Sequence, residues 1–222
     1  MANNVRDISS NIDHTLLKPD ATKKNILDLC DQAREFGFKA VCVNPYFVSL
    51  CKKALAKTGV KVCSVVGFPL GATTKDAKLC EARGAVRAGA DEIDVVMNIG
   101  AFKSRDYAAV SAEIRSLKKV IKNRVLKVII ETSALSRVEI KQASRVAEKA
   151  GADFIKTSTG FGNRGASVED IRLIRSAVGR ETGIKASGGI KSYKQAVSLI
   201  DAGADRIGSS SSVSIVAGRS KR

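Results

Sequence analysis

The sequence contains a single histidine, His14, no tryptophan, and only seven phenylalanines and three tyrosines among 222 residues. One histidine excludes zinc sites that need several imidazoles. It also leaves only His14 for a Ser-His-Asp triad, which no GxSxG elbow supports. Because aromatic side chains form the stacking platforms of single-strand binding proteins, their scarcity argues against that class.

Long apolar runs are also missing, and those present are short, such as 95–97 and 128–130. None approaches the roughly 20 residues of a membrane span, so we expect no membrane contact. The opening stretch MANNVRDISSN lacks the apolar core of a secretory signal, and we expect a cytoplasmic protein. The five cysteines are odd in number and form no CxxC pair, which favours reduced thiols over a disulfide framework.

The charge is strongly one-sided, with 38 basic and 22 acidic residues and a net charge of +16. Such an excess suits nucleic acid, an acidic membrane or an anionic small molecule, or simply keeps the surface soluble. The basic residues are spread along the whole chain. We therefore expect no nucleic acid partner and favour an anionic small molecule.

The phrase Ala-Gly-Ala-Asp recurs at 88–91, 150–153 and 202–205, each time just before a short apolar run. A glycine at a helix C-terminus adopts the left-handed conformation at little cost, after which the chain turns into a strand. The phrase therefore predicts the helix-to-strand junction of a repeated βα unit. Helix starts are predicted where Ser136, Ser167 and Ser192 precede a capping partner three residues on.

Eight buried runs separated by helical patterns predict a parallel sheet covered on both sides. Eight such units average about 28 residues each, which is near the lower size limit of a (β/α)8 TIM barrel. We therefore predict this α/β fold, with a doubly wound open sheet as the alternative. We expect one domain over 1–222, with flexible ends at 1–10 and 218–222. The predicted strands are Ile12–Leu17, Ala40–Asn44, Lys61–Gly67, Glu92–Asn98, Leu126–Glu131, Phe154–Thr157, Ile184–Ser187 and Arg206–Ser209.

Two lysines, Lys156 and Lys185, fall near the ends of adjacent predicted strands, where a barrel places its active site. Neighbouring strands lie about 4.8 Å apart, so both side chains can enter one cavity. A second ammonium disfavours protonation of the first, which would make Lys156 or Lys185 a Schiff-base nucleophile. Asp94 could move protons and offset the charge. The plain alternative is that each lysine reaches solvent or pairs with a carboxylate. Further polar residues near strand ends are Asn98, Lys127, Glu131, Thr157 and Ser187.

Small residues follow the last two predicted strands, as Gly188-Gly189 and as Gly208 with a run of serines. Loops at this place in a barrel commonly hold phosphate, because glycine allows close approach and serine adds donors. We predict a phosphate site there, against the alternative of two ordinary turns.

Three further features are weaker. Residues 160–165 fit the dinucleotide pattern GxGxxG, but the helix signal at Ser167 comes after the third glycine, so we predict a loop over the site. His14 is expected to be a structural residue. Cys42 is expected to be a small core residue that could face the cavity.

At these residues the chain resembles the deoxyribose-phosphate aldolase family of class I aldolases, from about Ile12 to Val216. The resemblance is carried by IDHTLLKP, VVGFPLG, GADEIDVVMNIG, LKVIIET, DFIKTSTGF, IKASGGI and RIGSSS. It implies a TIM barrel that cleaves 2-deoxy-D-ribose 5-phosphate to D-glyceraldehyde 3-phosphate and acetaldehyde, without metal or other cofactor. It also implies a homodimer or homotetramer.

The resemblance assigns roles residue by residue. Lys156 matches the Schiff-base lysine, Lys185 the second lysine, and Asp94 the acid that moves protons. The positions that resemble the family's phosphate site are Gly160, Gly188, Gly189, Gly208, Ser209 and Ser210. Some members have a lysine where this chain has Phe161, and some end in a tyrosine that this chain lacks. Alternatives are another class I phosphosugar aldolase, a transaldolase, or a non-catalytic barrel that binds phosphate or nucleic acid.

Overall fold

A computed structural model describes residues 6–218, and within them eight parallel strands close into a barrel. Each strand pairs with the next along the chain, and the eighth pairs with the first. This closure confirms the predicted TIM barrel and rules out the open sheet. The strands are β1 Ile12–Leu16, β2 Ala40–Val43, β3 Lys61–Val66, β4 Glu92–Val96, β5 Val125–Ile129, β6 Phe154–Lys156, β7 Gly183–Ser187 and β8 Arg206–Ser209.

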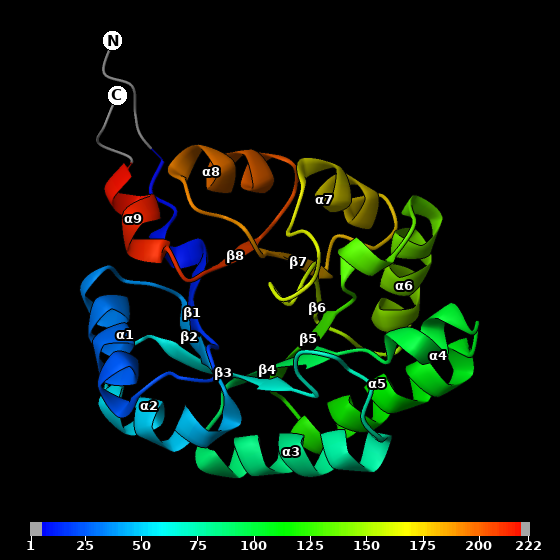
Figure 1. The fold of residues 1–222 in the computed structure, drawn as a ribbon, viewed down its shortest axis with the longest axis horizontal. Coiled ribbons are helices and arrows are strands. Elements are labelled where there is room, and N and C mark those ends of the chain that lie inside the picture. Colours follow the sequence, from blue (N-terminus) through cyan, green and yellow to red (C-terminus); the bar gives the residue numbers. More distant parts are fainter. Residues whose placement is uncertain (1–5, 219–222) are drawn as a thin grey trace.

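The helices form a ring outside the barrel (Figure 1). Their buried faces and the outward side chains of the strands make the large apolar core, as expected for a sheet covered by helices. The helices are α1 Lys23–Glu35, α2 Val48–Ala54, α3 Lys75–Ala88, α4 Ile99–Lys103, α5 Tyr107–Ile121, α6 Arg137–Lys149, α7 Val168–Arg175, α8 Tyr193–Asp201 and α9 Ser212–Ala217, with 3-10 turns at Ser9–Asn11, Pro45–Phe47 and Thr132–Ala134. None of the helices formed by residues 6–218 is both long and apolar enough to cross a membrane.

The predicted helix starts are confirmed by hydrogen bonds. The side chains of Ser136, Ser167 and Ser192 each accept from the backbone N–H three residues on. In each case the third residue's side chain also accepts from the backbone of the capping serine, so all three are full capping boxes.

The repeated Ala-Gly-Ala-Asp phrase forms the predicted helix-to-strand junction, and its aspartates also bind the preceding strand. Its glycines have φ of 106°, 98° and 112°, the left-handed region that glycine adopts most easily. Its aspartates, Asp91, Asp153 and Asp205, each accept from a backbone N–H near the start of the preceding strand, at 2.9, 2.7 and 2.8 Å. The phrase thus ends a helix and fixes the next strand beside its neighbour.

Of the ends predicted to be flexible, 1–5 and 219–222 lie outside the described residues. Within the remainder, Ile8 is 1% exposed and packs in the core. The prediction about the ends stays a prediction.

Candidate active site

Lys156 and Lys185 are register partners on β6 and β7, so the predicted adjacency of the two strands is confirmed. Both side chains point into the barrel and meet on one carboxylate oxygen. Asp94 Oδ2 accepts from Lys156 Nζ at 2.8 Å and from Lys185 Nζ at 2.7 Å. Lys156 is 2% exposed, and Lys185 and Asp94 are fully buried. The structure therefore brings together the three predicted catalytic residues, and both lysines pair with a carboxylate instead of reaching bulk solvent.

Four more charged side chains lie in the barrel below this trio. Lys127 Nζ donates to Asp94 Oδ1 at 2.9 Å and to Glu92 at 2.5 Å. Asp13 pairs with Lys185 at 2.6 Å, and Arg206 bridges Asp13 and Glu92 at 2.6 and 2.8 Å. The inside of the barrel is thus a charged network instead of the usual layers of branched apolar side chains.

The network contains three carboxylates and four cationic side chains, which leaves one positive charge in excess when all are ionised. Burial on its own would lower the pKa of Lys185, but the charges of Asp13 and Asp94 outweigh it and hold that pKa above its ordinary value. Burial would raise the pKa of Asp94, but Lys127, Lys156 and Lys185 hold it well below its ordinary value. Lys185 therefore stays an ammonium and Asp94 a carboxylate at neutral pH.

The network predicts a specific loss of stability in acid. Burial opposes ionisation of Asp13, but Lys185, Arg206 and Lys127 lower its pKa from 3.8 to about 2. A carboxyl group with a depressed pKa in the folded state stabilises the fold above its unfolded pKa, and that contribution is lost as the pH falls through the folded value. The wild type should therefore be more stable than Asp13→Asn at pH 6, and the difference should shrink between about pH 4 and pH 2.

Urea unfolding of both proteins across this range measures the difference. A stability difference that does not change between pH 6 and pH 2 would contradict the assigned charge state of Asp13.

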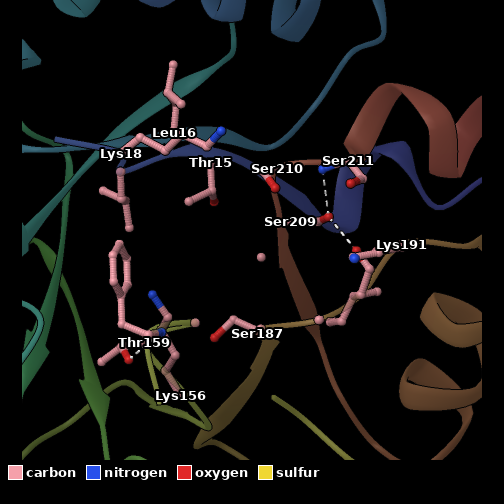
Figure 2. Close-up of a pocket in the computed structure, with 17 residues that line it drawn as sticks. Thr15, Leu16, Lys18, Lys156, Thr159, Ser187, Lys191, Ser209, Ser210 and Ser211 are labelled. Atoms are coloured by element: carbon pink, nitrogen blue, oxygen red, sulfur yellow. Dashed lines mark hydrogen bonds between the residues drawn. The ribbon is translucent and has the colours of Figure 1, made fainter. Parts of the chain in front are cut away.

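A cavity of about 340 Å³ opens above the trio at the carboxyl ends of the strands. In Figure 2, Lys156 and Thr159 lie on one side of the cavity, and Lys191 and Ser209 lie across from them. Of the trio, Lys156 is the member that lines the cavity. The cavity is also lined by Gly160, Gly188, Gly189, Gly208, Ser209 and Ser210, so the structure gathers every residue of the predicted phosphate site.

Hydrogen bonds join the loops that follow β7 and β8. Ser209 Oγ donates to the carbonyl of Ile190 at 2.7 Å and accepts from Ser211 N at 2.9 Å (Figure 2). Gly188 and Gly189 have φ of 87° and 73°, and a Cβ on Gly188 would lie 3.0 Å from the Cα of Gly165. This close backbone approach explains why glycine occurs at 188.

Residues 160–165 form a loop beside the cavity, and α7 begins only at Val168, so the prediction of a loop is confirmed. Glu131 fixes the start of this loop by accepting from the N–H and hydroxyl of Thr159, at 3.0 and 2.6 Å. Glu131 has a φ of 51°, which is strained for a residue other than glycine. Such strain persists where the surrounding contacts enforce it, and here Glu131 holds the start of the loop.

The remaining polar residues predicted near strand ends have different positions. Ser187 lines the cavity, whereas Thr157 is buried and donates to the carbonyl of Ser187. Asn98 caps the start of α4 and does not line the cavity. Lys127 lies in the middle of β5, within the network.

His14 faces α1, where its Nε2 lies 2.8 Å from Gln32 Oε1, and it does not line this cavity. Cys42 is fully buried inside the barrel, with its Sγ 3.9 Å from Asp94 Oδ2. A hydrogen bond from Cys63 lowers the pKa of the Cys42 thiol. Among the described residues, the one group of side chains with the spacing of metal ligands is Cys42, Cys63 and Asp94.

Sequence reasoning did not assign a role to several residues of the site. Asp13 and Glu92 lie within the stretches IDHTLLKP and GADEIDVVMNIG, but neither residue was given a role there. Each lies next to a residue that faces outward, so the alternation of side chains along a strand would have predicted that both face inward. Lys18, Thr159 and Lys191 line the cavity from loops, where periodicity gives no signal. Arg206 begins β8 and gave no signal apart from its charge.

The chain is similar to known aldolases over nearly its whole length. The model of the DeoC/LacD family of aldolases matches residues 9–219. The deoxyribose-phosphate aldolase of Thermococcus gammatolerans is 56% identical over 216 residues, 96% of each chain. The solved structure of the aldolase QR15 has a TM-score of 0.93 at 46% identity and 97% coverage of both chains. The tetrameric deoxyribose phosphate aldolase of Aeropyrum pernix has a TM-score of 0.89 at 37% identity, over 95% of this chain and 89% of that one.

Proposed function

This chain belongs to the DeoC/LacD family of aldolases, and from that premise we propose that it reversibly cleaves 2-deoxy-D-ribose 5-phosphate through an imine on Lys156. The products are D-glyceraldehyde 3-phosphate and acetaldehyde. The enzyme is a class I aldolase of deoxyribose phosphate breakdown, and its iminium takes the role that a metal has in other aldolases.

One observation carries the choice of Lys156. Its Nζ lies at the boundary between the cavity and the charged network, where it lines the first and contacts Asp94 in the second. Attack on an aldehyde requires the neutral amine. When Lys156 releases its proton, three cations face three carboxylates. The network therefore has no net charge in the state that reacts.

The reaction follows from this arrangement. Lys156 attacks C1 of the open-chain sugar, and loss of water gives a protonated imine. The C3 hydroxyl then gives up its proton and the C2–C3 bond breaks. The electrons of that bond move into the protonated imine, and glyceraldehyde 3-phosphate leaves. The resulting enamine is protonated at C2, and hydrolysis releases acetaldehyde. We assign these proton movements to Asp94 and Lys185, because Asp94 Oδ2 accepts from both Lys185 Nζ and Lys156 Nζ.

The substrate phosphate is assigned to the far side of the cavity. Gly160, Gly188, Gly189, Gly208, Ser209 and Ser210 would surround it, with Lys18 and Lys191 at the rim. Glycines permit close approach of backbone N–H groups, hydroxyls add donors, and exposed lysines add charge.

The direct test of the function is cleavage of 2-deoxyribose 5-phosphate in excess EDTA, followed as release of glyceraldehyde 3-phosphate. We expect robust turnover. No turnover from folded protein would contradict this substrate and leave another phosphosugar aldol as the candidate.

The phosphate assignment predicts a defect confined to binding. Lys191→Ala should raise KM for 2-deoxyribose 5-phosphate by about 10-fold or more, because a charged hydrogen bond contributes about 1.5–3 kcal/mol. The KM for unphosphorylated 2-deoxyribose should not change. Lys149→Ala, on α6 and outside the cavity, is the matched control. Equal effects on both substrates would refute a phosphate contact at Lys191.

We further propose a homodimer or homotetramer in the cytoplasm. The tetrameric relative from Aeropyrum pernix supports self-assembly. All five cysteines are free thiols, as expected in a reducing compartment. Light scattering on the purified protein measures the assembly, and a monomer at all concentrations would refute it.

A further inference from the structure

Two thiols lie against the carboxylate at the centre of the network. Cys63 Sγ is 3.0 Å from Asp94 Oδ1, and Cys42 Sγ is 3.9 Å from Asp94 Oδ2. The two sulfur atoms and a carboxylate oxygen all lie within 4.8 Å of one another. None of these side chains has a part in the proposed reaction except Asp94.

The backbone holds this arrangement in place. Cys42 and Cys63 are register partners on β2 and β3, in the middle of the closed barrel. Both are fully buried, so their side chains have little freedom to separate. Two sulfurs and one oxygen from rigid strands form a three-ligand set of the kind that zinc and cadmium accept, with a fourth position left open.

One side chain, Leu17, connects the cavity with the thiols. Leu17 lines the cavity and is 9% exposed. The same side chain packs in a small cluster with Cys42, Cys63 and Val65, separate from the main core. Leu17 thus contacts both the cavity and the cluster that contains the two thiols.

We propose that Cys42, Cys63 and Asp94 form an inhibitory site for a thiophilic divalent cation such as Zn²⁺ or Cd²⁺. Binding breaks two S–H bonds and forms two metal–sulfur bonds and one metal–oxygen bond, and the two protons go to water. The charge of the barrel interior does not change, because a dication replaces two protons. Affinity rises with pH, since protons are released.

Inhibition follows from the ligand that the metal shares with the active site. Asp94 is the acceptor for Lys156, Lys185 and Lys127. Lys156 and Lys185 both contact Oδ2 of Asp94, so a metal that takes Oδ2 withdraws that oxygen from the two lysines that the proposed reaction uses. This inference goes beyond the proposed function, and its binding measurement does not depend on that function.

The probe is Cd²⁺ alone, added to the full-length protein in a chelator-free buffer. We expect one equivalent to produce the ultraviolet charge-transfer band of cadmium–thiolate bonds, and excess EDTA to remove the band. Aldolase activity should fall in parallel with the band and return with EDTA.

Cysteine variants test which thiols bind the Cd²⁺ ion. Cys63→Ala should lose the band. The Cd²⁺ concentration that halves this variant's own activity should rise by about 10-fold or more, since even changes in residues that only contact a metal ligand lower metal affinity by that factor. Cys63→Ser preserves size and serves if the alanine variant does not fold. The matched control is Cys51→Ala, an equally buried thiol on α2, and Cys80→Ala removes the exposed thiol. Both controls should keep the band and the inhibition.

Two results would overturn the proposal. One is a band that remains in Cys63→Ala or disappears in Cys51→Ala. The other is a band formed at one equivalent while activity is unchanged, which would leave a metal site that does not disturb Asp94.

Discussion

Replacing Lys156 with alanine is expected to lower kcat by about 10⁴-fold or more, the scale seen when an enzyme loses a covalent nucleophile. Without the ε-amine no imine forms, and the remaining groups have no electron sink for C2–C3 cleavage. The cavity is otherwise intact, so substrate should still bind. The measurement is the initial rate of 2-deoxyribose 5-phosphate cleavage at saturating substrate.

The same variant should stay folded, which makes the loss interpretable. Asp94 keeps Lys127 and Lys185 as partners at 2.9 and 2.7 Å. Removal of Lys156 also takes away the excess positive charge, so no carboxylate is left unpaired. Lys103→Ala, a surface lysine paired with Glu139, is the control for mutating a lysine as such. Activity of Lys156→Ala within ten-fold of wild type would show that another group is the nucleophile.

Replacing Asp94 with asparagine should damage both activity and stability. The amide cannot take up a proton at neutral pH, so kcat should fall by about 10²–10⁴-fold, the usual range for a lost acid–base group. The four cations would then face only Asp13 and Glu92. Removing one partner from a buried ionic network typically costs about 3–5 kcal/mol in the free energy of unfolding.

Urea unfolding and steady-state kinetics on the same preparation separate the two effects. Asp31→Asn, which removes an exposed carboxylate paired with Arg34, should change neither quantity. A folded Asp94→Asn protein with nearly wild-type kcat would remove Asp94 from the proton pathway and leave it a purely structural role.

Much of the fold was predictable because it depends on short-range signals. The Ala-Gly-Ala-Asp junctions and the three serine caps mark where helices end and begin, and the eight predicted strands agree with the observed ones to within two residues. The adjacency of Lys156 and Lys185 followed from strand order alone, because consecutive strands of a barrel are neighbours.

The inside of the barrel was less predictable because its contacts are long-range. Asp13 pairs with Arg206, 193 residues along the chain, and no local pattern indicates such a partner. Cys42 was predicted to be a small core residue that could face the cavity, and Cys63 was given no role. Only the strand register places both sulfurs against Asp94. Glu131 holds Thr159 through a strained backbone conformation that its sequence neighbours do not reveal.

The central claim is that catalysis passes through an imine on Lys156, and chemical trapping tests it most directly. The enzyme is incubated with acetaldehyde, reduced with borohydride, digested and analysed by peptide mass spectrometry. We predict a single ethyl group on Lys156, absent when borohydride is omitted. An ethyl group on Lys127 or Lys185 instead, or no adduct from enzyme that turns over 2-deoxyribose 5-phosphate, would contradict the mechanism.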